Sequence, residues 1–154
     1  MKLAIGCDEA AFELKETIKG VLKSKNIEVE DFGTFTEDEK VLYPDVAIKV
    51  AESIQRGDNE RGILLCGTGI GMAITANKVE GIRAAVCHDP YSVERSRKSN
   101  DAQIMCMGAR VIAPQLAEYL TELWLGCEFA GGGSSEKVDR IREYEKEVKH
   151  TATI

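Results

Sequence analysis

Short, continuously apolar segments alternate along the chain with segments in which apolar residues recur every three or four positions. The first apolar run, residues 2–6, is followed by Leu14, Ile18 and Leu22, whose spacing places them on one face of a helix. The same alternation predicts strands over 27–33, 62–66, 82–87 and 104–107, followed by helices over 43–57, up to residue 77, over 90–99 and over 114–125. The run 62–66 is apolar throughout, which is typical of a parallel strand covered on both faces. The pattern predicts an α/β protein with a Rossmann-like, three-layer α/β/α fold and a five-stranded parallel sheet.

The C-terminal pattern does not fit the core of such a fold. After the triple glycine 131–133, residues from about 134 to 149 form a charged helical pattern, with Val138, Ile141 and Val148 as a thin apolar stripe. That stripe is too narrow for a core helix. The helix is therefore either solvated or packed on a second subunit, and residues 1–154 are expected to form a single domain.

Composition narrows the classes of partner and cofactor. The 154 residues carry 26 acidic and 20 basic side chains, a net charge of −6, without a dense basic stripe, which argues against a nucleic-acid or membrane-surface partner. The sequence has neither a long apolar span nor a signal-peptide pattern, so we expect a cytoplasmic protein. The five cysteines form no C-x-x-C pair and only two histidines are present, so we expect no disulfide framework, no metal and no cofactor.

The most informative segment for chemistry follows the central apolar strand. In parallel α/β sheets, ligands bind outside the carboxyl ends of the strands. Here Gly67, Gly69 and Gly71 would let backbone N–H groups face a ligand at a helix start, where a Cys66 thiolate, an enediolate oxygen or a phosphate would be stabilised. Cys66 is therefore a candidate base beside an oxyanion site. The competing interpretation is a small buried cysteine followed by a tight turn.

Three other strand ends carry polar side chains, each with two candidate roles. Asp8 could bind substrate hydroxyls or cap the following helix. His88 could move a proton or be a hydrogen-bonded structural residue, and Arg110 could bind a phosphate or form a surface ion pair. A nucleotide-binding loop is a weaker alternative, because Met72 stands where a dinucleotide fingerprint has its third glycine and no Gly-Lys-Ser/Thr motif follows.

A set of short motifs between residues 2 and 144 is specific in combination. They are Gly6-Cys7-Asp8, Tyr43-Pro44-Asp45, Cys66-Gly67-Thr68-Gly69-Ile70-Gly71, Ala76-Asn77-Lys78, Gly81-Ile82-Arg83-Ala84, Ser99-Asn100-Asp101-Ala102 and Gly108-x-Arg110-Val111-Ile112. Together they resemble the ribose-5-phosphate isomerase B / galactose-6-phosphate isomerase family. The resemblance implies a homodimer, or a tetramer of paired dimers, with active sites between subunits and metal-free isomerisation of a phosphorylated sugar through a cis-enediolate.

The resemblance also implies residue roles. Cys66 matches the family's base, Thr68 a hydroxyl that assists proton transfer, and the backbone of 67–71 the enediolate cradle. Residues that line the family's sugar site are matched by Asp8, Tyr43, Asn77 and Asn100, and the resemblance implies that Asn100 reaches the neighbouring subunit's site. Arg110 matches a family arginine near the phosphate.

The chain departs from the family where histidines and arginines are usual. Glu9 and Ser99 stand at two histidine positions of members that act on ribose 5-phosphate, and Gly133 and Lys137 stand at two arginine positions. A lysine can supply positive charge near a phosphate but cannot form an arginine fork. In the family, the histidine that aligns with Ser99 is associated with opening the sugar ring, a step that a four-carbon ketose phosphorylated at C4 does not need.

The segment 88–95 resembles the branch of the family that handles erythrulose 4-phosphate. We therefore expect an aldose–ketose isomerase acting on a ribose 5-phosphate type of substrate or on a tetrulose 4-phosphate. The alternatives are a catalytically impaired sugar-phosphate-binding subunit of a mixed isomerase and, from the glycine pattern alone, a nucleotide-binding module. The presence of Cys66 and Thr68 favours the active enzyme.

Overall fold

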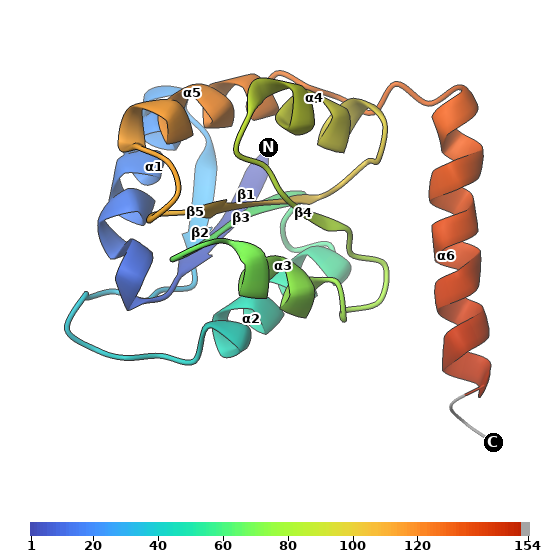
Figure 1. The fold of residues 1–154 in the computed structure, drawn as a ribbon, viewed down its shortest axis with the longest axis horizontal. Helices are drawn as coiled ribbons and strands as arrows, with labels where there is room; N and C mark the ends of the chain where they lie inside the picture. Colours follow the sequence, from blue (N-terminus) through green and yellow to red (C-terminus); the bar gives the residue numbers. More distant parts are fainter. Residues whose placement is uncertain (152–154) are drawn as a thin grey trace.

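The computed structural model describes residues 1–151 and places a five-stranded parallel sheet between two layers of helices (Figure 1). The strands are β1 (Lys2–Cys7), β2 (Glu28–Asp31), β3 (Arg61–Cys66), β4 (Ala84–Val86) and β5 (Ile104–Gly108). The helices are α1 (Phe12–Ser24), α2 (Tyr43–Gln55), α3 (Ile70–Ala76), α4 (Pro90–Lys98), α5 (Pro114–Leu125) and α6 (Gly133–Thr151), with a short 3-10 helix, η1 (Glu9–Ala11), before α1. The predicted fold class is confirmed.

The strand order is β2-β1-β3-β5-β4, and every neighbouring pair is parallel. The chain therefore adds β2 at one side of β1 and then crosses to β3 on the other side, after which β4 forms the opposite edge and β5 lies between β3 and β4. In the register of the central strands, Cys7 lies beside Leu65, and Cys66 lies beside Gly108. The carboxyl ends of β1, β3 and β5 consequently meet at one edge of the sheet, where ligands bind in such folds.

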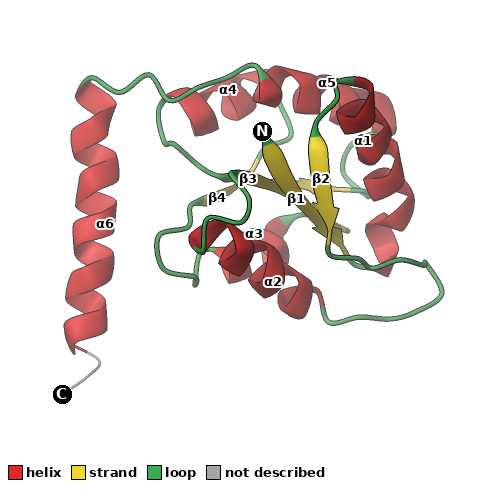
Figure 2. Ribbon diagram, turned by 180° about the vertical axis from the view of Figure 1, so that it is seen from behind, coloured by secondary structure: helices red, strands yellow, loops and turns green. Residues whose placement is uncertain are grey.

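Helices cover both faces of the sheet, with α1, α4 and α5 on one side and α2 and α3 on the other (Figures 1 and 2). Successive side chains of β3 enter opposite cores: Ile63 and Leu65 pack with the first layer, while Leu64 and Cys66 pack with the second. Because a strand sends alternate side chains to opposite faces, a strand buried on both faces is apolar at every position. This explains the continuous apolar run that predicted a central strand.

The strand predicted over 82–87 is shorter in the structure, where β4 comprises three residues. Ile82 lies in a turn instead: its N–H donates to the Val79 carbonyl at 3.1 Å, after Gly81 with φ of +83°. The Asn77 side chain then brackets the first residue of the strand, donating to the Ala84 carbonyl at 2.9 Å and accepting from the Ala84 N–H at 2.8 Å. An amide side chain thus satisfies backbone groups that a neighbouring strand would otherwise bind.

Helix α6 stands beside the layers rather than in them (Figures 1 and 2). The Gly81 N–H donates to the Glu145 carboxylate at 3.0 Å, and Arg142 lies 3.8 Å from Asp101. Its apolar stripe is unevenly covered: Val138 is 2% exposed, whereas Ile141 is 50% exposed. The predicted C-terminal helix is therefore present, and most of its apolar stripe lacks cover within residues 1–151.

Candidate active site at the carboxyl edge of the sheet

Cys66 ends the central strand and is buried to 6% exposure. The chain then turns through Gly69, whose φ of +79° favours glycine, and the Gly69 N–H donates to the Cys66 sulfur at 3.1 Å. Gly69 is also constrained by packing, since a Cβ there would lie 3.0 Å from the carbonyl carbon of Met107. The loop thus holds the sulfur of Cys66 at the edge of the sheet with one backbone N–H directed at it.

Thr68 lies on the solvent side of the same loop. Its hydroxyl accepts the Ile70 N–H at 3.2 Å, and its Cα rests on the end of β5, where a Cβ on Gly108 would come within 2.6 Å of it. Gly67 and Gly69 are buried while Thr68 is exposed. The Thr68 hydroxyl and the Cys66 sulfur, two residues apart in the chain, therefore lie at the same edge of the sheet.

Tyr43 borders the other side of the loop. It opens α2, and its ring lies so close to Gly71 in the first turn of α3 that a Cβ on Gly71 would overlap the ring carbons. The segment that leads into Tyr43 is held by Glu9, whose carboxylate accepts the Val41 N–H at 3.2 Å. The phenol is therefore positioned from both η1 and α3.

Two carboxylates and one guanidinium surround the loop. Asp8 accepts the Ala10 N–H at 3.1 Å as the cap of η1, which confirms its predicted capping role. Burial raises the pKa of Asp8, and the neighbouring Glu9 adds to that rise, while Arg110 opposes it. Hydrogen bonds from backbone N–H groups lower the pKa of Glu9, with further help from Lys40 and Arg110.

Arg110 is exposed, and its guanidinium lies against Gly67, with Nη1 3.1 Å from the position a Cβ would take there. Among the side chains that the structure describes, Arg110 forms no ion pair within 4 Å, although its charge lowers the pKa of the nearby Asp8 and Glu9. An exposed guanidinium at the carboxyl edge, beside the glycine loop, is available to an anionic ligand.

His88 follows β4 and points at the end of β5. Its Nε2 accepts the Gly108 N–H at 2.9 Å. Burial lowers the pKa of His88, partly offset by Asp89. Nε2 is thus occupied by a backbone donor, so the neutral imidazole carries its proton on Nδ1.

The remaining predicted site residues lie elsewhere in the chain. The Asn77 amide is bonded to Ala84, as described above. Ser99 and Asn100 follow α4, which runs from the carboxyl edge back toward the amino ends of the strands, and the Ser99 hydroxyl accepts from Arg95 at 3.1 Å. Lys137 is exposed on α6. Asn77, Ser99 and Asn100 thus follow the ends of helices that lead away from the carboxyl edge, and Lys137 lies on the helix beside the layers.

Sequence reasoning missed three buried basic side chains, Lys15, Arg61 and Arg97, of which Lys15 is the most deeply buried. Lys15 in α1 is fully buried, and its ammonium donates to both oxygens of Asp31 at 2.8 and 3.0 Å and to the Thr34 carbonyl at 2.6 Å. It ties α1 to the segment that continues toward Tyr43. The available signal was helical spacing, because a residue three positions before Ile18 shares its inward face.

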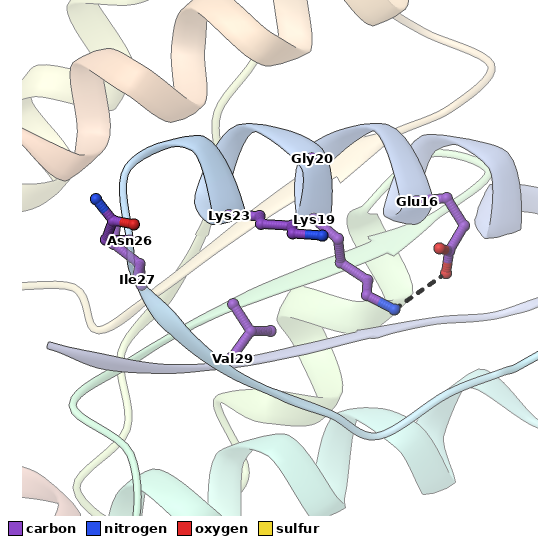
Figure 3. Close-up of a pocket in the computed structure, with 7 residues that line it drawn as sticks. All are labelled: Glu16, Lys19, Gly20, Lys23, Asn26, Ile27 and Val29. Carbon is purple, nitrogen blue, oxygen red and sulfur yellow. Dashed lines mark hydrogen bonds and ion pairs between the residues drawn. The ribbon is translucent and has the colours of Figure 1, made fainter.

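A groove of about 470 Å³ lies between α1 and the edge strand β2 (Figure 3). It is lined by Glu16, Lys19, Gly20, Lys23, Asn26, Ile27 and Val29, with Lys19 paired to Glu16 at 3.4 Å. None of the predicted site residues borders it. Among the described residues, no group of histidine, cysteine or acidic side chains is arranged to hold a metal ion, and no helix is long and apolar enough to cross a membrane.

Comparison with known proteins places these features in a family. A family model described as Ribose/Galactose Isomerase matches residues 3–141. A Listeria innocua protein named ribose-5-P isomerase B is 61% identical over 95% of this chain and 98% of its own length, and a Pectobacterium atrosepticum protein named D-erythrulose-4-phosphate isomerase is 53% identical over 97% and 99%. The solved structure of Clostridium thermocellum ribose-5-phosphate isomerase B superposes with a TM-score of 0.94 and 47% identity, covering 96% of this chain and 99% of that one.

Proposed function

Because the chain belongs to the ribose/galactose isomerase family, we propose that it interconverts an aldose phosphate and a ketose phosphate through a cis-enediolate, with Cys66 as the base. The observation that carries the residue assignment is the position of the Cys66 sulfur, at the carboxyl end of the central strand and within 3.1 Å of the Gly69 nitrogen. A cysteine in reach of a carbon acid at this edge can act as a general base once it is a thiolate.

The proposed reaction is a proton transfer in two halves. The Cys66 thiolate removes the proton from C2 of the aldose, the electron pair forms the C1–C2 double bond, and the carbonyl oxygen takes up the negative charge. Backbone N–H groups of the 67–71 loop stabilise that oxygen. The Thr68 hydroxyl passes the O2 proton to O1, and the Cys66 thiol returns its proton to C1. No electrons leave the substrate, so the chemistry requires no redox cofactor.

The charged groups around the loop have distinct proposed roles. Arg110 is the guanidinium beside Gly67 and is assigned to the phosphate. Asp8 and Tyr43 are assigned to sugar hydroxyls, because both flank the loop and neither is fully buried. Glu9 holds the Val41 backbone beside them, so the wall that includes Tyr43 keeps its place when substrate binds.

A second copy of the chain completes the proposed site. Ser99 and Asn100 lie at the far end of α4 and Lys137 lies on α6, so they can reach a substrate only at another subunit's carboxyl edge. The exposed part of the α6 stripe, with Ile141 at 50% and Val148 at 47% exposure, supplies an apolar surface for such pairing. We assign a homodimer as the working unit, with a tetramer as two such dimers.

The substrate proposed is a tetrulose 4-phosphate, with a pentose 5-phosphate as the alternative. Relatives with each kind of name are similar to this chain at 53% and 61% identity, so overall similarity does not separate them. Ser99 does favour the shorter sugar, since a serine hydroxyl is a far weaker acid than an imidazolium for opening a sugar ring. A cytoplasmic setting is proposed as well, in keeping with five unpaired cysteines.

The deciding experiment is proton NMR of the purified protein in heavy water with D-erythrulose 4-phosphate, ribose 5-phosphate and allose or galactose 6-phosphate in turn. Deuterium exchange or product with one sugar, absent from a folded Cys66→Ala variant, supports both the reaction and the base. If the folded protein gives neither deuterium exchange nor product with any of the three sugars, the isomerase assignment is refuted in favour of a binding subunit. Undiminished exchange in Cys66→Ala would refute the base alone.

A further inference from the structure

The imidazole of His88 takes the place of a rung in the β4–β5 ladder. Where β4 ends, the Cys87 N–H still donates to the Cys106 carbonyl at 3.1 Å. The next rung of a parallel ladder would pair the Gly108 N–H with a carbonyl of the departing strand. Instead, Nε2 of His88 accepts that N–H at 2.9 Å. A side chain therefore fixes the last residue of β5 after its neighbouring strand has left the sheet.

Gly108 contacts the backbone of the loop that follows Cys66, residues 67–71. On its other side it pairs with Cys66, and the Ala109 N–H donates to the Cys66 carbonyl at 2.9 Å. The Thr68 Cα lies within 2.6 Å of the position of a Gly108 Cβ, so the two backbones are in direct contact. In a close-packed interior, a displacement of Gly108 must move Thr68 or Cys66.

We propose that His88 is a positioning residue whose neutral imidazole, by accepting the Gly108 N–H, holds the end of β5 under Thr68 and so keeps Cys66 and Thr68 in register with the substrate. Its catalytic consequence rests on the proposed isomerase function; the hydrogen bond itself does not. An accepting Nε2 requires the ring proton on Nδ1. Protonation of Nε2 removes the acceptor, so the Gly108 N–H loses this hydrogen bond in acid.

The surroundings of the ring set the direction of this response. Burial lowers the pKa of His88, because an imidazolium is poorly solvated there, and Asp89 at the start of α4 opposes that effect. The first charged side chain after Gly108 is Arg110. Its guanidinium lies against Gly67. The bond to Gly108 is therefore complete at neutral pH and is lost as the pH falls through the depressed pKa of His88.

A proton-shuttle role makes a different demand on the same residue. A shuttle needs a titrating nitrogen in contact with substrate, whereas a positioning acceptor needs only a lone pair at the location of Nε2. Glutamine can place its side-chain oxygen near that location and does not titrate. His88→Gln therefore separates the two roles, and His88→Ala removes both.

The test compares wild type, His88→Gln and His88→Ala across the pH range below neutrality, with the sugar phosphate that the wild type isomerises. We expect His88→Ala to lower kcat by about ten- to a hundredfold at neutral pH, with a smaller effect on KM, since misplacement of catalytic groups costs about this much. The difference from wild type should shrink as the pH falls through the depressed pKa of His88, because the protonated wild type also lacks the hydrogen bond to Gly108. His88→Gln should keep kcat near that of wild type and lose the acid decline that His88 causes. Asp89→Asn, which keeps the cap on Ser92 but removes the charge, should move that decline to lower pH.

NMR of the labelled wild type gives a readout independent of catalysis. The Nδ1–H tautomer of His88 at neutral pH and a Gly108 amide signal that titrates with the ring would support the proposal even if no sugar were isomerised, an outcome that would count against the proposed function alone. A Gly108 amide that does not respond to His88 titration would overturn the positioning role. Loss of activity in His88→Gln equal to that in His88→Ala would also overturn it, in favour of direct proton transfer.

Discussion

The ring of Tyr43 lies directly against the Cα of Gly71, so two helices from different parts of the chain meet at the entrance to the glycine loop. Gly71→Ala should displace that ring, and we expect kcat/KM to fall at least tenfold, with a loss of stability of about 1–3 kcal/mol from overpacking. Steady-state kinetics and urea unfolding measure the two effects.

The matched control is Gly20→Ala in α1, where a Cβ would meet no atom within 4 Å. This substitution should leave kinetics unchanged and stabilise the protein by about 0.5–1 kcal/mol, because alanine in a helix loses less backbone entropy than glycine. Equal kinetic effects of the two variants would contradict the role assigned to the Tyr43–Gly71 contact.

Cys66→Ala should reduce isomerisation by about a hundred- to ten-thousandfold, the usual contribution of a general base. Its cost in stability should be about 1 kcal/mol, typical of a small buried truncation. Cys106→Ala is the control, since Cys106 belongs to the same core cluster but is fully buried under the site. A comparable loss of activity in Cys106→Ala would point to core disruption instead of removal of a base.

A site shared between subunits predicts complementation. Homodimers of Cys66→Ala or of Asn100→Ala should each be poorly active, whereas subunits mixed and re-equilibrated should regain about a quarter of wild-type activity, because half of the dimers are mixed and each carries one intact site. Activity of the mixture is compared with the mean of the two separate variants. If mixing brings no gain although mass spectrometry detects mixed dimers, each site is built from one chain.

The buried Lys15–Asp31 pair predicts an acid-sensitive stability. Burial alone raises the pKa of Asp31, but hydrogen bonds from Lys15 and Lys19 outweigh it, and the resulting pKa lies below its ordinary value. A depressed carboxyl pKa stabilises the folded state above the unfolded-state value of about 3.9, and that stability is lost as the pH falls through the folded-state pKa. Asp31→Asn should therefore be less stable at neutral pH and show a shallower acid decline, measured by urea unfolding at several pH values.

Replacement of Lys15 and replacement of Lys19, the two lysines that pair with Asp31, should lower the folding stability by different amounts. Lys15→Met leaves Asp31 without its buried partner and should lower the free energy of unfolding by about 3 kcal/mol. Lys19→Met removes a pairing side chain that is 34% exposed and should cost about 1 kcal/mol or less. Equal costs for the two variants would mean that the buried ammonium contributes no more than the exposed one.

Local sequence patterns anticipated much of the fold and the centre of the site. The apolar run before Cys66 predicted a central parallel strand, and the alternation of strands and helices predicted the layers. The glycines after Cys66 predicted a turning loop at this strand end, and Gly69 does turn the chain there, with its N–H donating to the Cys66 sulfur. These features could be predicted because side-chain periodicity and glycine conformations are properties of neighbouring residues.

The sequence by itself therefore determined the fold class, the order of elements and the position of the glycine loop to which we assign the chemistry. Only the tertiary structure decided that His88 binds the Gly108 backbone, that Asn77 brackets Ala84 and that Lys15 is buried against Asp31. It also placed Ser99 and Asn100 at the other end of α4 from the carboxyl edge. Each of these outcomes depends on which segments, distant in sequence, come to lie side by side, and polar groups there take whatever partner the packing leaves within hydrogen-bond reach.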